Sequence, residues 1–510
     1  MMRFVNTNTA GFDRNVVYLV NDGWDDWFKY ETCYRLVYRN ILIGTVKIAK
    51  KNQVDRRVSL ESSFEKLPDD YFSLGVGVAY YTELKKHDDI RAEILEGLND
   101  MAFNLDIFEA VKNEDVTQWS LLRECTPATV RGQYHRLAHG KAKLTDYYFK
   151  YAISNNDNAI PTKHLEFEVN AGSKPGSNVH VLVGNNGIGK TTILRGIINA
   201  VVNEGDNNSK GKIISDEVFP FANVVNVSFS IFDDPLLEED VEEVFIPYSY
   251  VGVFRYENGL KVINPNTYEI FLEHYTSIMI SGTKKDLWKN AIKELETDVT
   301  FRSLNILSWT NIDDPEDVSR VRVDRNSELE EILLAVKQKY RELTEDKFKL
   351  LSSGHTNILL TLASLIDKVE ERTLVVIDEP EGHLHPTLIS AFIRALSDLL
   401  TYRNGVAIIA THSSVIVQAV PSNCVWIIER LENNLYFHRP KHETFGDNLG
   451  EIATDIFKYN ILETYYHKEI NDVIEKANSY EEALEMFGGQ LGDEARALLR
   501  AYMLTKEKHD

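Results

Sequence analysis

The sequence predicts an α/β fold in which helices cover a parallel sheet on both faces, with a separate α+β module before it. From about residue 145, short apolar strands such as 179–184, 373–379 and 405–413 alternate with helical stretches. This alternation is typical of a parallel sheet that is buried on both faces. Before residue 144, runs rich in β-branched and aromatic residues are mixed with a helical period at 89–104, which indicates an α+β module.

Each expected element follows from its local pattern. β-branched, aromatic and alternating apolar runs predict strands, and apolar residues spaced by three and four predict helices. The expected strands are 16–20, 36–50, 147–154, 164–169, 179–184, 224–233, 248–256, 373–379, 405–413 and 425–430. The expected helices are 89–104, 191–203, 357–370 and 387–401.

Length and composition indicate a globular protein of several domains. The chain has 510 residues, of which 43% are hydrophobic and 26% are charged, and its net charge is −22. Cys33, Cys125 and Cys424 lie too far apart to form a disulfide framework or a zinc ribbon. No run approaches about 18 apolar residues, and the start lacks a signal peptide's apolar core, so we expect a cytoplasmic protein without membrane segments.

We expect three segments. Residues 1–144 form the N-terminal module, for which the sequence suggests no role. Residues 145–460 form the α/β domain, interrupted by a mainly helical insert at about 266–345. Residues 461–510 form a helical tail. The acidic run 233–243 is most simply a solvated loop or helix face.

A phosphate-binding loop is the clearest motif. Residues 184–191 read GNNGIGKT, which matches G-x-x-x-x-G-K-[ST] between an apolar strand and a helix. Glycines let the backbone N–H groups and the helix N-terminus approach a β-phosphate closely. Lys190 adds a charge on the β- and γ-phosphates, and the Thr191 hydroxyl is placed to ligate Mg²⁺. The predicted nucleotide contacts are Gly184, Asn185, Asn186, Gly187, Ile188, Gly189, Lys190, Thr191 and Thr192.

A second nucleotide element ends the strand at 373–379. Asp378 and Glu379 stand at its carboxyl end, which in a parallel sheet faces the site crevice. Asp378 can hold Mg²⁺ through water, and Glu379 can orient and deprotonate the attacking water. A strand whose end is merely solvated is the alternative. With the phosphate loop in the same chain, the sequence predicts ATP and Mg²⁺ as cofactors.

The motif order resembles that of the ABC-type ATPases. Residues 351–355, LSSGH, resemble the family signature LSGGQ, and the strand ending Ala410-Thr411-His412-Ser413 resembles the one that carries its switch histidine. In that family the signature of one subunit clamps the γ-phosphate on the other. The resemblance therefore implies a dimer in which Ser352, Ser353 and Gly354 contact nucleotide, and in which His412 contacts the γ-phosphate and helps to position water. Ser353 and His355 replace the commoner Gly and Gln.

The peptide DEPEGHLHP at 378–386 is similar to a segment of the OLD/RecF-like ATPases, which are kin to Rad50 and SMC proteins. The resemblance implies a loop that touches the partner subunit. His383 and His385 have no third ligand nearby, which argues against a metal site. Glu381 is either an assisting acid or a hydrogen-bonding residue of the loop. The strand at 224–233 lacks the family's usual glutamine, for which Ser230 or Asp233 could substitute, unless this is an ordinary edge strand.

The last motif points to a biological class. HETFG-x-N-x-G at 442–450 resembles ATPase subunits of bacterial anti-phage systems, notably the Septu-type and retron-associated PtuA ATPases, which work with a separate HNH-type nuclease. The resemblance implies an ATPase whose nucleotide-dependent dimer or larger oligomer senses a trigger and controls a separate effector, a nuclease or toxin. The toprim nuclease constellation of OLD proteins is missing after His412.

The alternative function is that of a RecF/Rad50-like DNA-repair ATPase that clamps duplex DNA. A chain of net charge −22 would need a concentrated basic groove for this. The basic clusters at 131–143 and 320–325 are modest. The acidic balance therefore favours a protein partner, although it leaves DNA binding possible.

Overall fold

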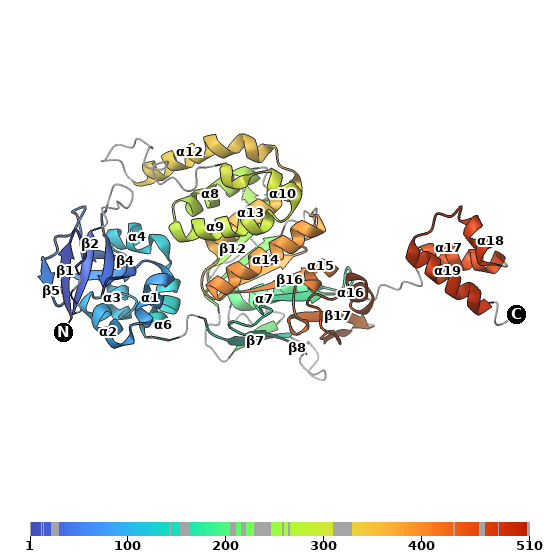
Figure 1. Cartoon of the computed structure of the whole chain (residues 1–510), viewed down its shortest axis with the longest axis horizontal. Coiled ribbons are helices and arrows are strands. Elements are labelled where there is room, and N and C mark those ends of the chain that lie inside the picture. The colour runs from blue at the N-terminus through green and yellow to red at the C-terminus, as the bar shows by residue number, and fades with distance from the viewer. Residues whose placement is uncertain are drawn as a thin grey trace. The chain divides into compact units, whose positions relative to one another are not determined.

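The computed structural model of the 510-residue chain is shown in Figure 1. It describes residues 2–11, 13, 15–21, 30–141, 144–153, 163–203, 211–215, 221–228, 246–257, 260–263, 266–309, 329–382, 384–431, 434–457, 465–477 and 479–506. Contacts divide the chain into two units, residues 1–445 and 446–510, which are described separately. None of the helices described is both long and apolar enough to cross a membrane. The acidic run 233–243, the basic cluster 320–325, Ser230 and His383 lie outside the described residues.

Unit 1 begins with a six-stranded sheet in the order β5-β1-β2-β3-β4-β6. Its strands are β1 (Arg3–Thr7), β2 (Val16–Asn21), β3 (Cys33–Tyr38), β4 (Ile41–Lys50), β5 (Ser63–Phe64) and β6 (Tyr71–Gly75). Short helices follow: α1 (Gly77–Lys85), α2 (Asp88–Gly97), α3 (Leu105–Val111), α4 (Asp115–Trp119), α5 (Pro127–Thr129) and α6 (His135–Ala138). The sheet and helices share one apolar core that runs from Met2 to Ala138.

Two expected elements of this region differ in the structure. The run 36–50 is split into β3 and β4 because Arg39 and Asn40 adopt φ values of 48° and 62°, as a tight hairpin turn requires. The helix expected at 89–104 ends at Gly97. The buried Asp100 carboxylate accepts hydrogen bonds from the backbone N–H groups of Ala102 and Phe103, both at 2.9 Å. The helix ends because Asn99 adopts a left-handed φ of 49° and the backbone N–H of Asp100 donates to the carbonyl oxygen of Leu95 at 2.9 Å, and the Asp100 carboxylate then holds the turn that follows.

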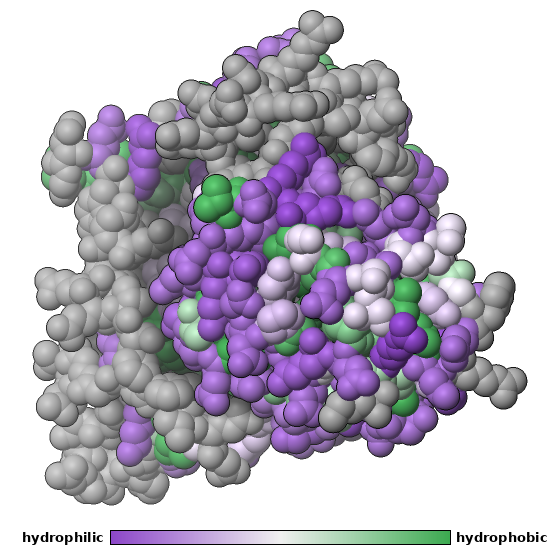
Figure 2. Space-filling view, turned by 90° about the vertical axis from the view of Figure 1, so that its left-hand side faces the viewer, coloured by the Kyte–Doolittle hydropathy of each residue, from purple (hydrophilic) through white to green (hydrophobic). Residues whose placement is uncertain are grey.

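The surface of the N-terminal sheet and its turns is mixed in character. Ile41, Leu42 and Val54 are among its exposed apolar side chains. Figure 2 looks at the end of the molecule that lies on the left in Figure 1, and shows small apolar spots among mostly hydrophilic side chains. Scattered apolar residues of this kind are normal on a protein surface.

The main sheet of unit 1 has seven strands in the order β12-β11-β15-β16-β9-β17-β18. All neighbouring pairs are parallel except β17 with β18. The strands are β9 (Val179–Val183), β11 (Asn223–Ser228), β12 (Tyr248–Gly252), β15 (Thr373–Asp378), β16 (Val406–Thr411), β17 (Val425–Leu431) and β18 (Asn434–His438). The predicted α/β fold with a mainly parallel sheet is confirmed.

Both faces of this sheet are buried, which explains its continuously apolar strands. On one face, Val376 and Ile408 share a core with Ile197 of α7 (Lys190–Val202). Their neighbours Val375 and Ile409 point to the other face and are also buried. On that face lies α13 (Ser353–Lys368), which contacts β11 and β12.

An antiparallel sheet of β10 (Gly211–Ser215), β7 (Tyr147–Ile153) and β8 (Lys163–Val169) covers the outer side of α7. Phe149 and Phe167 of this sheet stack at 4.9 Å between ring centroids within the core that also holds Ile197. The helix that carries the phosphate loop is therefore fixed between two sheets (Figure 1).

Helices form further layers beyond α13 and α14 (Pro386–Arg403), as Figure 1 shows. They are α8 (Thr267–Met279), α9 (Gly282–Leu295), α10 (Val299–Ser303) and α12 (Leu329–Lys349), with a small hairpin of β13 (Phe254–Glu257) and β14 (Leu260–Ile263) before them. Near the end of α13, Asp367 binds His274 of α8 at 2.8 Å and Lys284 of α9 at 2.6 Å. Burial would raise the pKa of Asp367, but these two partners hold it well below its usual range.

Hydrogen bonds join the N-terminal layers to the rest of unit 1. The Glu124 carboxylate accepts from the first backbone N–H groups of α9, at 3.1–3.2 Å. The Thr126 hydroxyl donates to Glu370 at 2.6 Å, and Arg136 forms an ion pair with Glu371. Glu370 and Glu371 lie three and two residues before β15 begins, so these contacts are at the opposite end of that strand from Asp378.

Unit 2 consists of short helices: α16 (Leu449–Asp455), α17 (Tyr465–Lys476), α18 (Tyr480–Met486) and α19 (Asp493–Lys506). The last three enclose a small apolar core of Ile470, Ala477, Ala483, Leu499 and Met503. Such a core is small for an independently stable domain.

Candidate nucleotide-binding site

The expected phosphate loop lies between β9 and α7, which begins at Lys190. Gly187 and Gly189 adopt φ values of 76° and 109°, in the region that residues with a Cβ rarely occupy. A Cβ at Gly187 would meet no heavy atom within 4 Å, so the loop is open there, whereas one at Gly184 would lie 2.7 Å from the carbonyl oxygen of Ile428. The loop thus has the backbone shape and the open side that a phosphate chain needs.

The Lys190 side chain folds back over this loop. Its Nζ donates to the carbonyl oxygen of Gly184 at 2.9 Å and lies 4.0 Å from Oε1 of Glu379. The lysine side chain is 5% exposed, while that of Glu379 is 46% exposed. A buried cation beside an open cradle of backbone N–H groups fits the phosphates of ATP, and the neighbouring Thr191 hydroxyl suits Mg²⁺.

Sheet register brings the other predicted residues to the same edge. Asp378 of β15 pairs with Ala410 of β16, which in turn pairs with Leu182 of β9. The carboxyl ends of all three strands therefore meet, with Glu379 and His412 one or two residues beyond the paired positions. His412 Nδ1 lies 3.5 Å from Oε1 of Glu379. The sheet thus assembles Lys190, Asp378, Glu379 and His412 in one place.

Glu379 has an unusual backbone conformation. Its φ is 46°, in the left-handed region, and its N–H donates to the carbonyl oxygen of Ala410 at 2.9 Å. A non-glycine residue held in this region costs about 1–3 kcal/mol and is concentrated at functional sites. The strain turns the Glu379 side chain off the strand direction and toward Lys190 and His412.

The signature stretch forms the N-terminus of α13. Ser352 is the N-cap, and its hydroxyl accepts from the backbone N–H of His355 at 3.3 Å. Ser352 and Ser353 are exposed, and the first turn holds no acidic residue. The His355 ring packs edge-on against Phe301 of α10, and burial lowers the pKa of His355. This end of a 16-residue helix is suited to an anion.

Known proteins with related sequences bear on this site. Residues 179–418 match the family model "AAA domain, putative AbiEii toxin, Type IV TA system". The protein ea59 of Escherichia phage lambda is 34% identical over 537 residues, which span the whole of this chain and 99% of that protein. The chain belongs to the ea59 family.

The family model makes this ea59-family chain a P-loop ATPase that binds nucleotide, generally with Mg²⁺. Solved structures of ABC cassettes are also similar. The ADP conformation of an ABC transporter cassette covers 61% of this chain and 96% of its own length at 14% identity and a TM-score of 0.25. A bacterial Atm1-family ABC exporter with ATP bound covers 69% of this chain and 48% of its own length, at 14% identity and a TM-score of 0.28. Scores this low support no statement about function.

Two residues of the ea59-family site were not predicted from the sequence. Arg430 of β17 donates from Nη2 to the carbonyl oxygen of Ile188 at 3.0 Å, so a guanidinium braces the phosphate loop from the side. Asp298, the N-cap of α10, accepts from the Thr387 hydroxyl at the start of α14. Neither stands in a recognisable motif. Only the capping pattern Asp-x-Thr at 298–300 hinted at a helix start.

Asp298 ties α10 to the start of α14. Burial would raise its pKa, but hydrogen bonds from Thr300, Thr387 and two backbone N–H groups lower the pKa of Asp298 to about 2. Because His355 packs on Phe301 of the same helix, α10 contacts both the signature helix and the start of α14. The insert is thus joined to the predicted signature helix and to α14, the helix that follows Asp378 and Glu379 in the chain.

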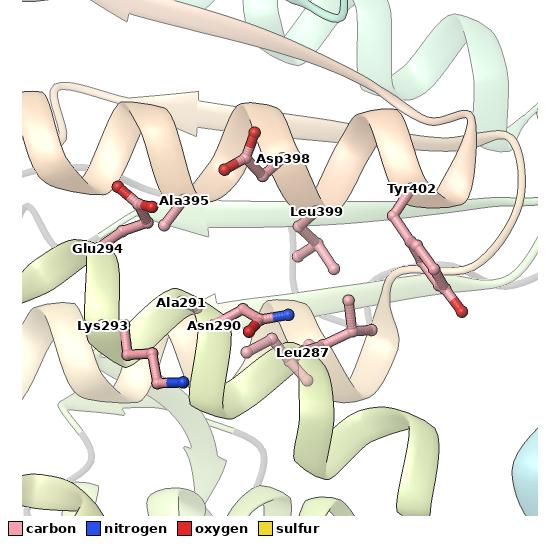
Figure 3. Close-up of a pocket in the computed structure, with 10 residues that line it drawn as sticks. Leu287, Asn290, Ala291, Lys293, Glu294, Ala395, Asp398, Leu399 and Tyr402 are labelled. Atoms are coloured by element: carbon pink, nitrogen blue, oxygen red, sulfur yellow. The ribbon is translucent and has the colours of Figure 1, made fainter.

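A cavity of about 360 Å³ lies elsewhere, between α9 and α14 (Figure 3). Its floor is apolar and includes Leu287, Ala395 and Leu399, while Asn290 and Asp398 stand at its rim. None of the predicted site residues lines it. The volume is within the range of ligand pockets, but its mixed rim indicates no particular ligand.

Proposed function

We propose that this chain is a nucleotide-gated ATPase that closes as a dimer on ATP and thereby controls a separate effector, in a phage-related defence role. The observation that carries the proposal is the convergence of Lys190, Glu379 and His412 at the carboxyl edge of the main sheet. A lysine that can bind phosphate, an acid that can activate water and a histidine within reach of both are suited to ATP hydrolysis.

In this proposal each residue has a distinct task. The phosphate loop and Lys190 bind the β- and γ-phosphates, while Thr191 and Asp378 would hold Mg²⁺, which offsets the charge on the phosphates. Glu379 orients and deprotonates the attacking water. His412 touches the γ-phosphate. Binding of ATP gives Lys190 a phosphate in place of Glu379, so it frees the carboxylate for water.

Dimerisation would supply the missing anion contact. Ser352 and Ser353 are exposed at the N-terminus of α13, beside the buried Gly354, and the first turn has no acidic residue. A second copy could place this terminus over the γ-phosphate, since a helix N-terminus attracts anions. Closure would then depend on ATP and would be released after hydrolysis.

Coupling to a trigger would pass through the N-terminal module. Its residues Thr126 and Arg136 contact Glu370 and Glu371 at the start of β15, the strand that ends in Asp378. Its Glu124 caps α9 of the helical insert. A displacement of this module would therefore act on both β15 and the helical insert, which supports a sensing role.

The phage context rests on the relative encoded by phage lambda, which matches this chain over 99% of its own length. This supports a role in phage infection, and we propose that the chain serves defence against phage through an effector nuclease or toxin. A DNA clamp is less well supported. Arg131 and Arg136 of the basic cluster at 131–143 are ion-paired with Glu109 and Glu371.

The ATPase part is tested with Lys190→Ala and Glu379→Gln. We expect Lys190→Ala to lose nucleotide binding, because it removes the buried cation of the loop. Glu379→Gln should bind ATP, lose hydrolysis by about 10²- to 10⁴-fold and accumulate as a dimer in sedimentation. If Glu379→Gln binds ATP but stays monomeric at all concentrations, the dimer proposal is wrong.

The effector part is tested by purification of tagged Glu379→Gln from its native host with ATP, followed by mass spectrometry. Lys190→Ala, prepared in parallel, is the matched control. A nuclease or toxin that is enriched only with Glu379→Gln supports the proposal. If ATP instead produces salt-sensitive binding to duplex DNA without any protein partner, the clamp function is favoured.

A further inference from the structure

Glu381 lies beyond the predicted catalytic pair, in the loop between β15 and α14. Its Oε1 accepts a hydrogen bond from the Thr411 hydroxyl at 2.6 Å and another from the backbone N–H of His412 at 2.8 Å. The same oxygen lies 3.2 Å from Nδ1 of His412. One carboxylate oxygen thus holds the end of β16 and the histidine ring together.

This distance bears on where the ring carries its hydrogen. A carboxylate only accepts hydrogen bonds, so an oxygen 3.2 Å from Nδ1 favours the tautomer in which Nδ1 carries the hydrogen. The ring then has Nε2 on its other side, away from Glu381. The nitrogen that is not bound to a carboxylate is the one available to a phosphate.

The burial of Glu381 argues against a merely local role. Its side chain is 9% exposed, whereas those of Glu379 and His412 are 46% and 48% exposed. Oε2 is buried, and no partner for it is found among the residues described. A buried acid with one unsatisfied oxygen destabilises the fold, and such groups call for a functional reason.

Glu379 cannot orient His412 equally well. It lies farther from Nδ1, at 3.5 Å, and it also lies 4.0 Å from Lys190 Nζ. As the proposed base it must be free to bind water, and it is therefore unsuited to a fixed contact. The two acids of the loop thus have different environments, one open and one buried.

We propose that Glu381 is a positioning residue for hydrolysis, which holds His412 with Nδ1–H directed at its own carboxylate and Nε2 directed at the terminal phosphate of the nucleotide. This inference rests on the proposed ATPase site and adds a residue that acts through His412. When ATP is bound, a ring that carries both hydrogens donates to Glu381 from one nitrogen and to phosphate from the other.

Two substitutions test it. Glu381→Leu removes the acceptor, and Glu381→Gln keeps an oxygen that can still accept from Thr411 and His412 but lacks the charge. We expect Glu381→Leu to lower kcat by roughly 10- to 100-fold, as loss of an orienting partner does, with KM for ATP within about threefold of the wild type. Glu381→Gln should recover part of kcat.

The matched control is Glu443→Gln. Glu443 also caps a loop, where Oε1 accepts backbone N–H groups of Ser422, Thr444 and Phe445, but it is not part of the site. The Glu443→Gln variant should therefore retain the kcat of the wild type. If Glu381→Leu keeps that kcat, or if kcat and ATP affinity fall together with no recovery in Glu381→Gln, the positioning role is excluded.

A second measurement does not depend on hydrolysis. Nitrogen-15 shifts of labelled histidine, assigned with His412→Gln, report which ring nitrogen carries the hydrogen. We expect it on Nδ1 in the wild type and on Nε2 in Glu381→Leu. An Nε2–H ring in the wild type would overturn the inference. If the wild type hydrolyses ATP no faster than Lys190→Ala, the proposed function fails. The nitrogen-15 shifts of His412 still test whether Glu381 contacts Nδ1 in that case.

Discussion

Arg136→Ala should loosen the junction between the N-terminal module and β15. Glu371 is 5% exposed and Arg136 is 21% exposed, so the substitution leaves a carboxylate buried without its main partner. Removal of one partner of a buried pair costs about 3–5 kcal/mol. Because Arg372 also acts on Glu371 and Arg136 is partly solvated, we expect a cost somewhat below this range, about 2–3 kcal/mol.

This loss should depend on pH in a defined direction. Burial raises the pKa of Glu371 above its ordinary value of 4.5, and Arg136 lowers it in part. Without Arg136 the pKa of Glu371 rises further, so the folded state binds its proton more tightly than the unfolded chain does. Below pH 4.5 Glu371 is protonated in both the folded and the unfolded state and needs no partner. The destabilisation caused by Arg136→Ala therefore grows as pH rises through the pKa of Glu371 in the folded state.

The assay is calorimetric unfolding at pH 5 and pH 8. In a cooperative unit of this size, a loss of 2–3 kcal/mol corresponds to a Tm lowered by roughly 2–3 °C at pH 8, with a smaller shift at pH 5. Arg131→Ala is the matched control, because its ion pair with Glu109 is exposed and should leave Tm close to that of the wild type. Equal shifts for the two variants, or a shift in Arg136→Ala that is the same at both pH values, would refute the reasoning.

Three further outcomes are expected. Ser352→Ala removes the N-cap of α13 and should lower the free energy of unfolding by about 1 kcal/mol. It should also weaken ATP-dependent dimerisation in sedimentation, and an unchanged dimer would show that Ser352 is not part of the interface. Gly189→Ala places a Cβ at φ 109°, which costs about 1–2 kcal/mol and should weaken ATP binding about tenfold in a fluorescence titration while circular dichroism is unchanged. Burial raises the pKa of Asp100 from 3.8 to about 7, so its protonated form stabilises the fold and this stabilisation is lost as pH rises across that range. Asp100→Asn, which keeps the acceptor for Ala102 and Phe103, should flatten the dependence of Tm on pH between these values, and an unchanged slope would contradict the buried acid.

Local pattern was sufficient for much of the fold. The continuous apolar runs of β9, β15 and β16 predicted buried parallel strands, and the structure confirms them. The glycine pattern at 184–191 predicted a turn into a helix, which is where α7 begins. The pattern failed at one helix end: the helix expected at 89–104 stops at Gly97 because Asn99 adopts a left-handed φ of 49° and turns the chain away.

The candidate site was predictable only in part. The phosphate loop, Asp378, Glu379 and His412 stand in recognisable motifs, and sheet register brings them to one edge. Their roles remain predictions. Arg430 had no motif, because its contact with the phosphate loop depends on how β17 pairs with β9.

The sequence by itself determined the kinds of chemistry present and their order along the chain, because glycine spacing, apolar period and strand-end acids are local properties. Only the tertiary structure decided that Glu381 holds His412 across 31 positions and that Arg136 meets Glu371 across 235. Such pairs form where separate elements pack against each other. Their partners are set by the geometry of packing and not by the spacing of residues in the chain.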